Sequence, residues 1–291
     1  MVLVKFSSFL SAVLALASAA SLTQVTDFGK NPTNAGMYIY VPDSLPSSPT
    51  IILAIHWCHG TAQDFYTGTQ WANLADTHKF IVIYPNSPNS ADECWDVASS
   101  KTLSHDGGGD SQSIASMVSY TISKYNADTS KVFVTGVSSG AMMTNVMAAV
   151  YPNLFTAASA YSGVAAGCFA GPSVDYWNSD CATGKVVKTG EQWALIVKAM
   201  YPGYSGAYPK MQFWHGTADT VLYQQNLPEE TKEWTTVLGV ATAQAVTSNN
   251  SPLNGYTRVN YGGKVESILA QGVGHTVPVI EAESMKWFGI A

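Results

Sequence analysis

Six short apolar runs recur along the chain and alternate with longer amphipathic stretches. Most of these runs are apolar at successive positions rather than at alternate ones, which is the pattern of parallel strands buried on both faces. We therefore predict strands at 50–57, 80–85, 131–136, 157–163, 211–216 and 264–272. Helical spacing of apolar residues predicts helices between or after them, the clearest at 111–125, 140–150 and 278–290.

Alternating strands and helices indicate an α/β fold, with a mostly parallel central sheet that is flanked by helices on both faces. In such a sheet, ligands bind at the carboxyl ends of the strands. Residues that carry chemistry are therefore expected in the loops that directly follow the predicted strands.

The first 19 residues have the pattern of a signal peptide. Lys5 is followed by an apolar core at 9–16, and Ala17-Ser18-Ala19 fits the small-x-small cleavage pattern. The rival interpretation, a membrane anchor, needs about 20 apolar residues, and this stretch is shorter. We expect residues 20–291 to form one catalytic domain of a secreted protein that does not associate with membranes.

The charge of the chain bears on its partners. The formal net charge is −6, which provides no electrostatic footprint for nucleic acid. Only 12% of the residues are charged, about half of the usual share. A polar but weakly charged surface suits an extracellular protein that meets neutral polymers.

Four cysteines in a secreted chain predict two disulfides. Cys168 and Cys181 are separated by a polar loop and are expected to pair locally, which leaves Cys58 to pair with Cys94. A zinc site is the rival interpretation, but no CxxC spacing supports it. Asn249 begins the one N-glycosylation sequon and is a candidate glycosylation site.

A G-x-S-x-G pentapeptide follows the predicted strand at 131–136 and has Ser138 at its centre. A nucleophile on so sharp a strand-to-helix turn needs neighbours without side chains two positions away, and these are Gly136 and Gly140. Ser139 lacks such a pair. The plain alternative is a tight turn that happens to contain glycine and serine. The strand before it and the helix after it favour a nucleophile.

His275 is the best placed of the six histidines to act as the base. It lies in a glycine-bearing loop after the last predicted strand and before the last helix, which fits the chain order serine, acid, histidine. The others fit less well: His78 has the pattern of an exposed helix end, His105 lies in a polar loop, and His215 ends a strand where it could pack or hydrogen-bond.

Asp219 is the candidate acid, because it follows the strand at 211–216 and precedes His275. A carboxylate there would hold the tautomer of the imidazole and stabilise the imidazolium. The plain alternative is a turn-capping aspartate. The other acids between Ser138 and His275 fit less well. Asp175 and Asp180 lie in the loop bounded by cysteines, and a solvated helix face is predicted for Glu229, Glu230 and Glu233.

An oxyanion hole needs two convergent backbone N–H groups. One is expected from Ser139, directly after the candidate nucleophile. The other is expected from the loop after the first buried strand, where Cys58 is the best candidate and Trp57 the next. A metal cluster of His56, Cys58 and His59 is the rival interpretation; no carboxylate or further histidine is clearly directed at it, and we predict no metal site.

The stretches IHWCHGT, CWDV, VFVTGVSSGAMMTNVMAAVYPNLFTAASAYSGV, HGTAD and GVGHTVP occur in this order along the chain. Together they resemble the fungal secreted acetylxylan esterases of carbohydrate esterase family 1, a group related to feruloyl esterases and polyhydroxybutyrate depolymerases. The resemblance implies an α/β-hydrolase-like fold. It also implies Ser138 as nucleophile, Asp219 as acid and His275 as base, with the backbone amides near Cys58 and Ser139 as oxyanion hole.

The resulting hypothesis is a two-step acyl transfer from acetylated xylan or a related cell-wall polysaccharide, without a cofactor and by a monomer. Aromatic side chains at 65–71, 175–177 and 201–209 could supply a sugar-binding surface, with burial in the core as the alternative for each. Two rival functions remain open: a feruloyl esterase on the same fold, and an inactive hydrolase-like protein that binds polysaccharide.

Overall fold

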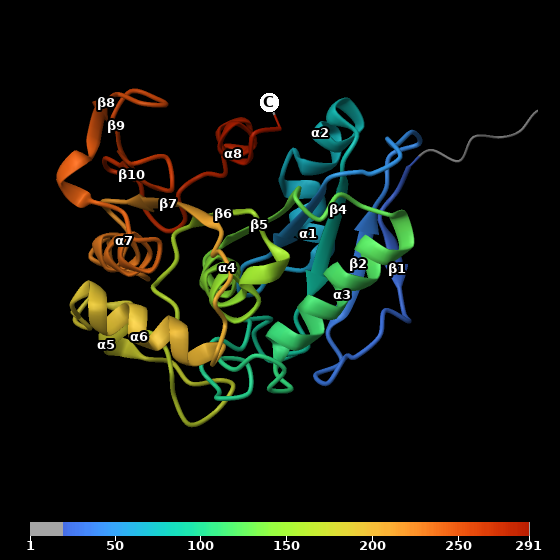
Figure 1. The fold of residues 1–291 in the computed structure, drawn as a ribbon, viewed down its shortest axis with the longest axis horizontal. Helices are drawn as coiled ribbons and strands as arrows, with labels where there is room; N and C mark the ends of the chain where they lie inside the picture. The colour runs from blue at the N-terminus through green and yellow to red at the C-terminus, as the bar shows by residue number, and fades with distance from the viewer. Residues whose placement is uncertain (1–19, 291) are drawn as a thin grey trace, which may run out of the picture.

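The computed structural model describes residues 20–290, which build a ten-stranded sheet in the order β1-β2-β4-β3-β5-β6-β7-β10-β9-β8 (Figure 1). Its six central strands run parallel. They correspond to the six predicted runs: β3 (Ile51–Ile55), β4 (Ile81–Asn86), β5 (Val132–Val137), β6 (Ala157–Tyr161), β7 (Lys210–Gly216) and β10 (Val265–Ala270). The predicted α/β fold with a mostly parallel sheet is confirmed.

The sheet also has two antiparallel strands at each end that the apolar runs did not predict. These are β1 (Thr23–Val25), β2 (Gly36–Tyr40), β8 (Val246–Asn249) and β9 (Tyr256–Tyr261). All four residues of β8 are exposed, and β2 is buried mainly at alternate positions. Edge strands of this kind carry no continuous apolar run, because one or both of their faces meet solvent.

Helices cover both faces of the sheet (Figure 1). One face is covered by α3 (Asp110–Tyr125), α4 (Ser139–Val150) and α7 (Asn226–Val237), and α6 (Gly190–Met200) packs against α4 and α7. The other face is covered by α1 (Ala62–Gly68), α2 (Trp71–His78) and α8 (Glu281–Phe288). Of these, α3, α4 and α8 correspond to the helices predicted at 111–125, 140–150 and 278–290. A helix was also predicted around 229–233, within α7, and α2 ends at His78, the predicted exposed helix end. The remaining helix, α5 (Ser179–Ala182), and the 3₁₀ turns η1 (Pro152–Leu154) and η2 (Thr242–Gln244) are short.

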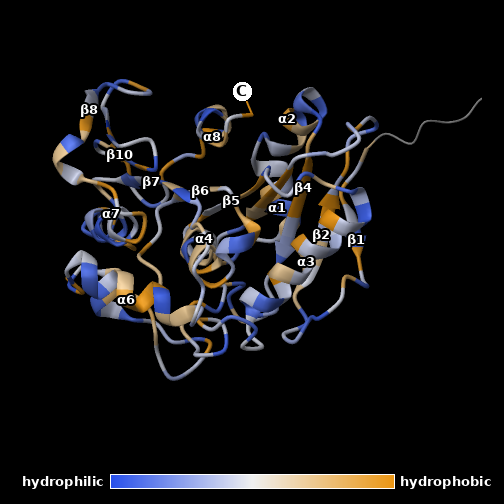
Figure 2. Cartoon of the chain, viewed as in Figure 1, coloured by the Kyte–Doolittle hydropathy of each residue, from blue (hydrophilic) through white to orange (hydrophobic). Residues whose placement is uncertain are grey.

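Successive residues of the central strands belong to two separate cores, one on each face. In β3, Leu53 packs on the side of α3 and α4, whereas Ile52 and Ala54 pack on the side of α1, α2 and α8. This arrangement explains why most of the runs are apolar at successive positions. Figure 2 shows hydrophobic colours on the strands around β4 and on parts of α4.

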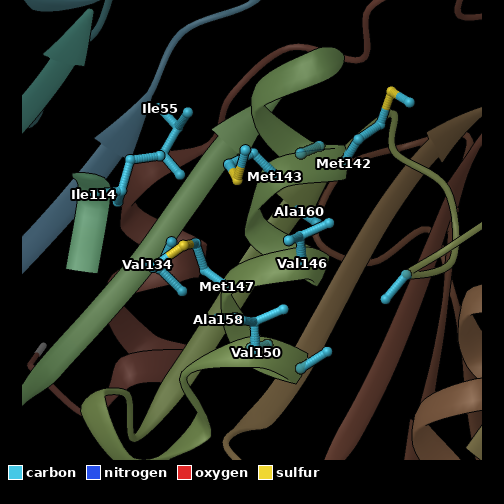
Figure 3. Close-up of a cluster of buried hydrophobic side chains, with 14 of the residues drawn as sticks. Ile55, Ile114, Val134, Met142, Met143, Val146, Met147, Val150, Ala158 and Ala160 are labelled. Atoms are coloured by element: carbon cyan, nitrogen blue, oxygen red, sulfur yellow. The ribbon is translucent and has the colours of Figure 1, made fainter. Parts of the chain in front are cut away.

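Helix α4 is buried along its whole length, as expected for a helix that is apolar on all sides. Its methionines and valines pack between β3, β5, β6 and α3, against partners such as Ile55, Ile114 and Val134 (Figure 3). The helix is therefore held firmly at the point where its first turn follows β5. This rigidity matters because Ser138 lies at that junction.

The cysteines form two disulfides, Cys58–Cys94 and Cys168–Cys181. Asn249, the candidate glycosylation site, is exposed on β8. Among the helices of residues 20–290, none is both long and apolar enough to cross a bilayer. The predicted signal peptide, residues 1–19, lies outside the described residues.

Candidate active site

Ser138 lies on a sharp turn between β5 and α4, with φ of 54° and ψ of −118°. Backbone approaches around the turn leave no room for side chains at the flanking glycines. A Cβ atom on Gly136 would lie 2.2 Å from the carbonyl oxygen of Gly140, and one on Gly140 would lie 2.2 Å from that of Ile55. The two glycines therefore permit the strained turn that presents Ser138 at the carboxyl edge of the sheet.

Two hydrogen bonds join the three predicted residues into a chain. Ser138 Oγ lies 2.8 Å from His275 Nε2, and His275 Nδ1 lies 2.7 Å from Asp219 Oδ2. A carboxylate accepts, so Nδ1 carries the hydrogen and Nε2 is free to accept the proton of the serine hydroxyl. This arrangement can activate a serine nucleophile.

Asp219 is buried and oriented by the backbone of its own loop. Its Oδ1 accepts hydrogen bonds from the N–H groups of Val221 and Leu222, both at 2.9 Å, which leaves Oδ2 for His275. Burial acts to raise the pKa of Asp219, but its hydrogen bond to His275, the charge of that imidazole and the Val221 N–H outweigh burial and lower it. Asp219 is therefore ionised when it faces His275.

His215 is fully buried beside this loop. Its Nε2 lies 2.7 Å from the carbonyl oxygen of Leu222 and 3.5 Å from Asp219 Oδ2. Burial lowers the pKa of His215, so it packs there as a neutral ring. His215 thus belongs to the support of Asp219, and the expectation that it packs or hydrogen-bonds at the strand end is confirmed.

A cavity of about 790 Å³ opens above Ser138 and His275. Cys58 and Ser139, the predicted oxyanion-hole residues, both line it. Ser139 is the first residue of α4, where backbone N–H groups have no acceptor within the helix. Cys58 lies in the loop after β3 and is tied to Cys94. The structure thus places both predicted residues along the cavity of the candidate nucleophile.

Comparison with known proteins assigns the chain to a family. Residues 35–246 match the family model described as esterase PHB depolymerase. The chain belongs to this family. Acetylxylan esterase A of Aspergillus oryzae is 57% identical over 274 residues, which cover 93% of this chain and 89% of that protein. A probable acetylxylan esterase A of Neosartorya fischeri is 56% identical over 277 residues, which cover 94% of this chain and 75% of that protein.

Solved structures agree with the sequence relatives. An acetyl xylan esterase from Aspergillus awamori has 56% identity and a TM-score of 0.91, covering 93% of this chain and 100% of that one. TT1662 from Thermus thermophilus has a TM-score of 0.53 at 13% identity, covering 94% of this chain and 98% of that one, and shows the fold alone. The resemblance to fungal acetylxylan esterases is confirmed, and this member of the esterase PHB depolymerase family is a carboxylic ester hydrolase.

Of the three aromatic segments in this esterase, only 175–177 reaches the cavity with exposed rings. Trp177 lines the cavity with 52% of its surface exposed. In the segment 65–71, Phe65 and Trp71 are fully buried in the core. In the segment 201–209, Tyr201 stacks between His105 and Tyr204, so neither face of its ring is open to a sugar.

The loop after β3 has no free ligand set of the kind that the rival metal cluster requires. His56 Nδ1 lies 2.7 Å from the carbonyl oxygen of Trp57, and its Nε2 accepts a hydrogen bond from Ser87 N–H at 3.1 Å. Cys58 is consumed by its disulfide. No three His, Cys, Asp or Glu side chains within residues 20–290 are grouped to hold a metal ion.

The prediction of a solvated helix face for Glu229, Glu230 and Glu233 is wrong. All three are buried, because α7 lies between the sheet and α6 and turns this side inward. Glu230 Oε1 accepts from Asn145 Nδ2 at 2.8 Å, and Glu233 Oε2 accepts from the Ala166 N–H at 3.1 Å. These polar residues form a buried hydrogen-bonded network. No feature of the single sequence distinguishes such a buried polar helix from a solvent-exposed one.

Proposed function

We propose that this chain is a secreted acetylxylan esterase that removes acetyl groups from acetylated xylan through an acyl-enzyme. The observation that carries the proposal is the hydrogen-bonded chain from Ser138 through His275 to Asp219, with spacings of 2.8 and 2.7 Å. The substrate class rests on the relatives that are named acetylxylan esterases and cover almost the whole chain.

In the first step, Ser138 Oγ attacks the acetyl carbonyl carbon while His275 Nε2 takes the serine proton. The backbone N–H groups of Ser139 and Cys58 are proposed to bind the developing oxyanion. The bond between the acetyl carbon and the sugar oxygen then breaks, and His275 protonates this oxygen as it leaves, so that the sugar regains its hydroxyl. An acetyl ester of Ser138 remains.

In the second step, His275 takes a proton from water, and the resulting hydroxide oxygen attacks the acetyl ester. Acetate leaves after collapse of the second tetrahedral intermediate, and His275 returns the proton to Ser138. Asp219 keeps Nδ1 of the ring protonated in both steps and stabilises the imidazolium that each step forms.

The remaining proposals concern the state of the protein. We propose that residues 1–19 are removed on secretion, that residues 20–291 act as one monomeric catalytic domain, and that Asn249 is glycosylated. The exposure of Asn249 on β8 supports the last point. Trp177, half exposed at the mouth of the cavity, is proposed to contact sugar rings.

A parallel assay on acetylated xylan, methyl ferulate and short-chain aryl esters tests the substrate class. The proposal expects rapid acetate release from acetylated xylan, activity on aryl acetates, and little or no release of ferulate. Preferred turnover of methyl ferulate would instead support the rival feruloyl esterase. Binding of xylan without turnover of any ester would support the inactive polysaccharide binder.

A further inference from the structure

The loop that carries His275 is anchored upstream of the histidine by the backbone around Asp219. The Ala218 N–H donates to the carbonyl oxygen of Val273 at 2.9 Å. Gly216, at the end of β7, allows this approach, because a Cβ atom there would lie 2.1 Å from the same oxygen. The upstream half of the loop is therefore seated directly on the segment that holds the acid.

Downstream of His275, the anchor is a single side chain. The N–H of Val277 donates to Ser162 Oγ at 3.0 Å, and Ser162 is fully buried directly after β6. The next hydrogen bond to the β6 region is made three residues later, where the Ile280 N–H donates to the hydroxyl of Tyr161 at 3.3 Å. One hydroxyl thus holds the backbone two positions after His275.

The backbone of Ser162 is unusual for a residue with a side chain. Its φ is 56°, in the left-handed region that glycine adopts without a steric penalty from Cβ. The conformation is held by its own N–H, which donates to the carbonyl oxygen of Trp214 at 2.7 Å. A strained non-glycine residue beside a catalytic site suggests that its side chain has a function there.

We propose that Ser162 is a positioning residue, whose hydroxyl holds the Val277 amide and thereby keeps His275 within proton-transfer distance of Ser138. This inference rests on the proposed function, because it assumes that His275 is the base. The imidazole lies 2.8 Å from Ser138 Oγ, inside the range of about 2.6–3.2 Å that proton transfer requires. A displacement of about 1 Å at such a site can lower the rate by about 100-fold.

The test compares Ser162→Ala and Ser162→Gly with the unmodified protein on 4-nitrophenyl acetate. Both variants remove the hydroxyl, but glycine also relieves the left-handed strain. We expect kcat to fall by about 10- to 100-fold in both, with KM changed by less than about twofold. The rate at which a fluorophosphonate labels Ser138 should fall in parallel, because that attack needs the same base.

Ser111→Ala is the matched control. Ser111 is equally buried and its hydroxyl donates to the carbonyl oxygen of Thr102 at 2.7 Å, on α3 and away from the cavity. This variant should lose thermal stability as Ser162→Ala does, but keep its kcat. If kcat falls in proportion to the drop in melting temperature, and equally in Ser162→Ala and Ser111→Ala, then Ser162 has only a structural role. That result would overturn the inference.

Ser138→Ala and His275→Ala belong in the same series, because they test the proposed function separately. If both abolish turnover while Ser162→Gly keeps kcat within about twofold, the triad stands and the positioning role of Ser162 is wrong. If Ser138→Ala stays active, the proposed function itself fails. Failure of both Ser162 variants to fold would also overturn the inference, since the hydroxyl would then serve the fold rather than the loop.

Discussion

Ser138 and Ser139 are chemically identical neighbours with different surroundings. Ser138 has a left-handed backbone and a hydroxyl 2.8 Å from His275, whereas the hydroxyl of Ser139 is buried without a hydrogen-bond partner among residues 20–290. The difference follows from the two glycines that flank Ser138 two positions away. The proposed role of each serine therefore depends on backbone geometry, and the spacing of the glycines predicts this geometry from the sequence.

At the scale of single residues, Asp219→Asn is expected to lower kcat by about 10⁴-fold. The amide can donate to His275 Nδ1 instead of accepting from it, which favours the wrong tautomer of the imidazole. Turnover of an aryl acetate measures the effect. A loss of less than about tenfold would mean that another group serves as the acid.

Among single residues, the burial of carboxylates was predicted least well. Ser138, Asp219 and His275 could be selected because each follows a strand, and chain order then limits the choices. Glu230 and Glu233 could not be recognised as buried, because the stretch around them is as polar as a surface helix. Their burial depends on α7 lying between the sheet and α6, which is tertiary information.

Glu230 and Glu233 should make the stability of the protein depend on pH. Burial raises the pKa of Glu230 to about 8, although its hydrogen bond from Asn145 acts in the other direction. Burial likewise raises the pKa of Glu233, and the nearby Glu230 adds to the effect while the Ala166 N–H opposes it. The folded chain therefore keeps protons that the unfolded chain releases near pH 4.5, the ordinary pKa of glutamate.

The sign of the dependence follows from this difference in bound protons. The folded state is fully stabilised below about pH 4.5 and loses stability as the pH rises toward 8, by about 1.4 kcal/mol per pH unit for each proton retained. Urea unfolding between pH 5 and 8 measures this slope, and Glu230→Gln should make it shallower. Glu191→Gln is the control, since the pKa of this exposed residue lies below its ordinary value. An unchanged slope in Glu230→Gln would contradict the account.

At the scale of elements, the sequence predicted the centre of the sheet better than its edges. The six central strands are buried on both faces, and most of them therefore appear as runs that are apolar at successive positions. The edge strands and the short helix α1 offer only a few residues each, and their patterns are too brief to separate from loops. The loops that carry the proposed catalytic residues follow central strands, so the part of the fold that matters for the candidate site was also the most predictable.

The junction of β5 and α4 should not tolerate a side chain at Gly140. A Cβ atom there would lie 2.2 Å from the Ile55 carbonyl oxygen and 2.5 Å from that of His56, and neither backbone can move independently of the sheet. We expect Gly140→Ala to destabilise the protein by about 1–3 kcal/mol and to lower activity with it. Gly68→Ala, whose new Cβ would meet only the Trp57 ring at 3.9 Å, is the control that should unfold like the unmodified protein.

At the scale of the whole molecule, the two disulfides have different expected roles. Cys58–Cys94 holds the loop of the proposed oxyanion hole, whereas Cys168–Cys181 closes a loop 13 residues long in sequence. Replacing either pair by alanine should lower the free energy of unfolding by about 2–4 kcal/mol. Only the loss of Cys58–Cys94 should also lower kcat on an aryl acetate, measured well below the melting temperature. Equal kcat values in the two variants would argue against an oxyanion hole that depends on the Cys58–Cys94 disulfide.

The central claim is that Ser138 carries the acyl group during deacetylation of xylan. Its most direct test is acetate release from acetylated xylan by Ser138→Ala, with the melting temperature measured on the same sample. The account predicts no detectable release of acetate and a melting temperature close to that of the unmodified protein, because the turn is held by its glycines and by α4. Acetate release that persists in this folded variant would contradict it.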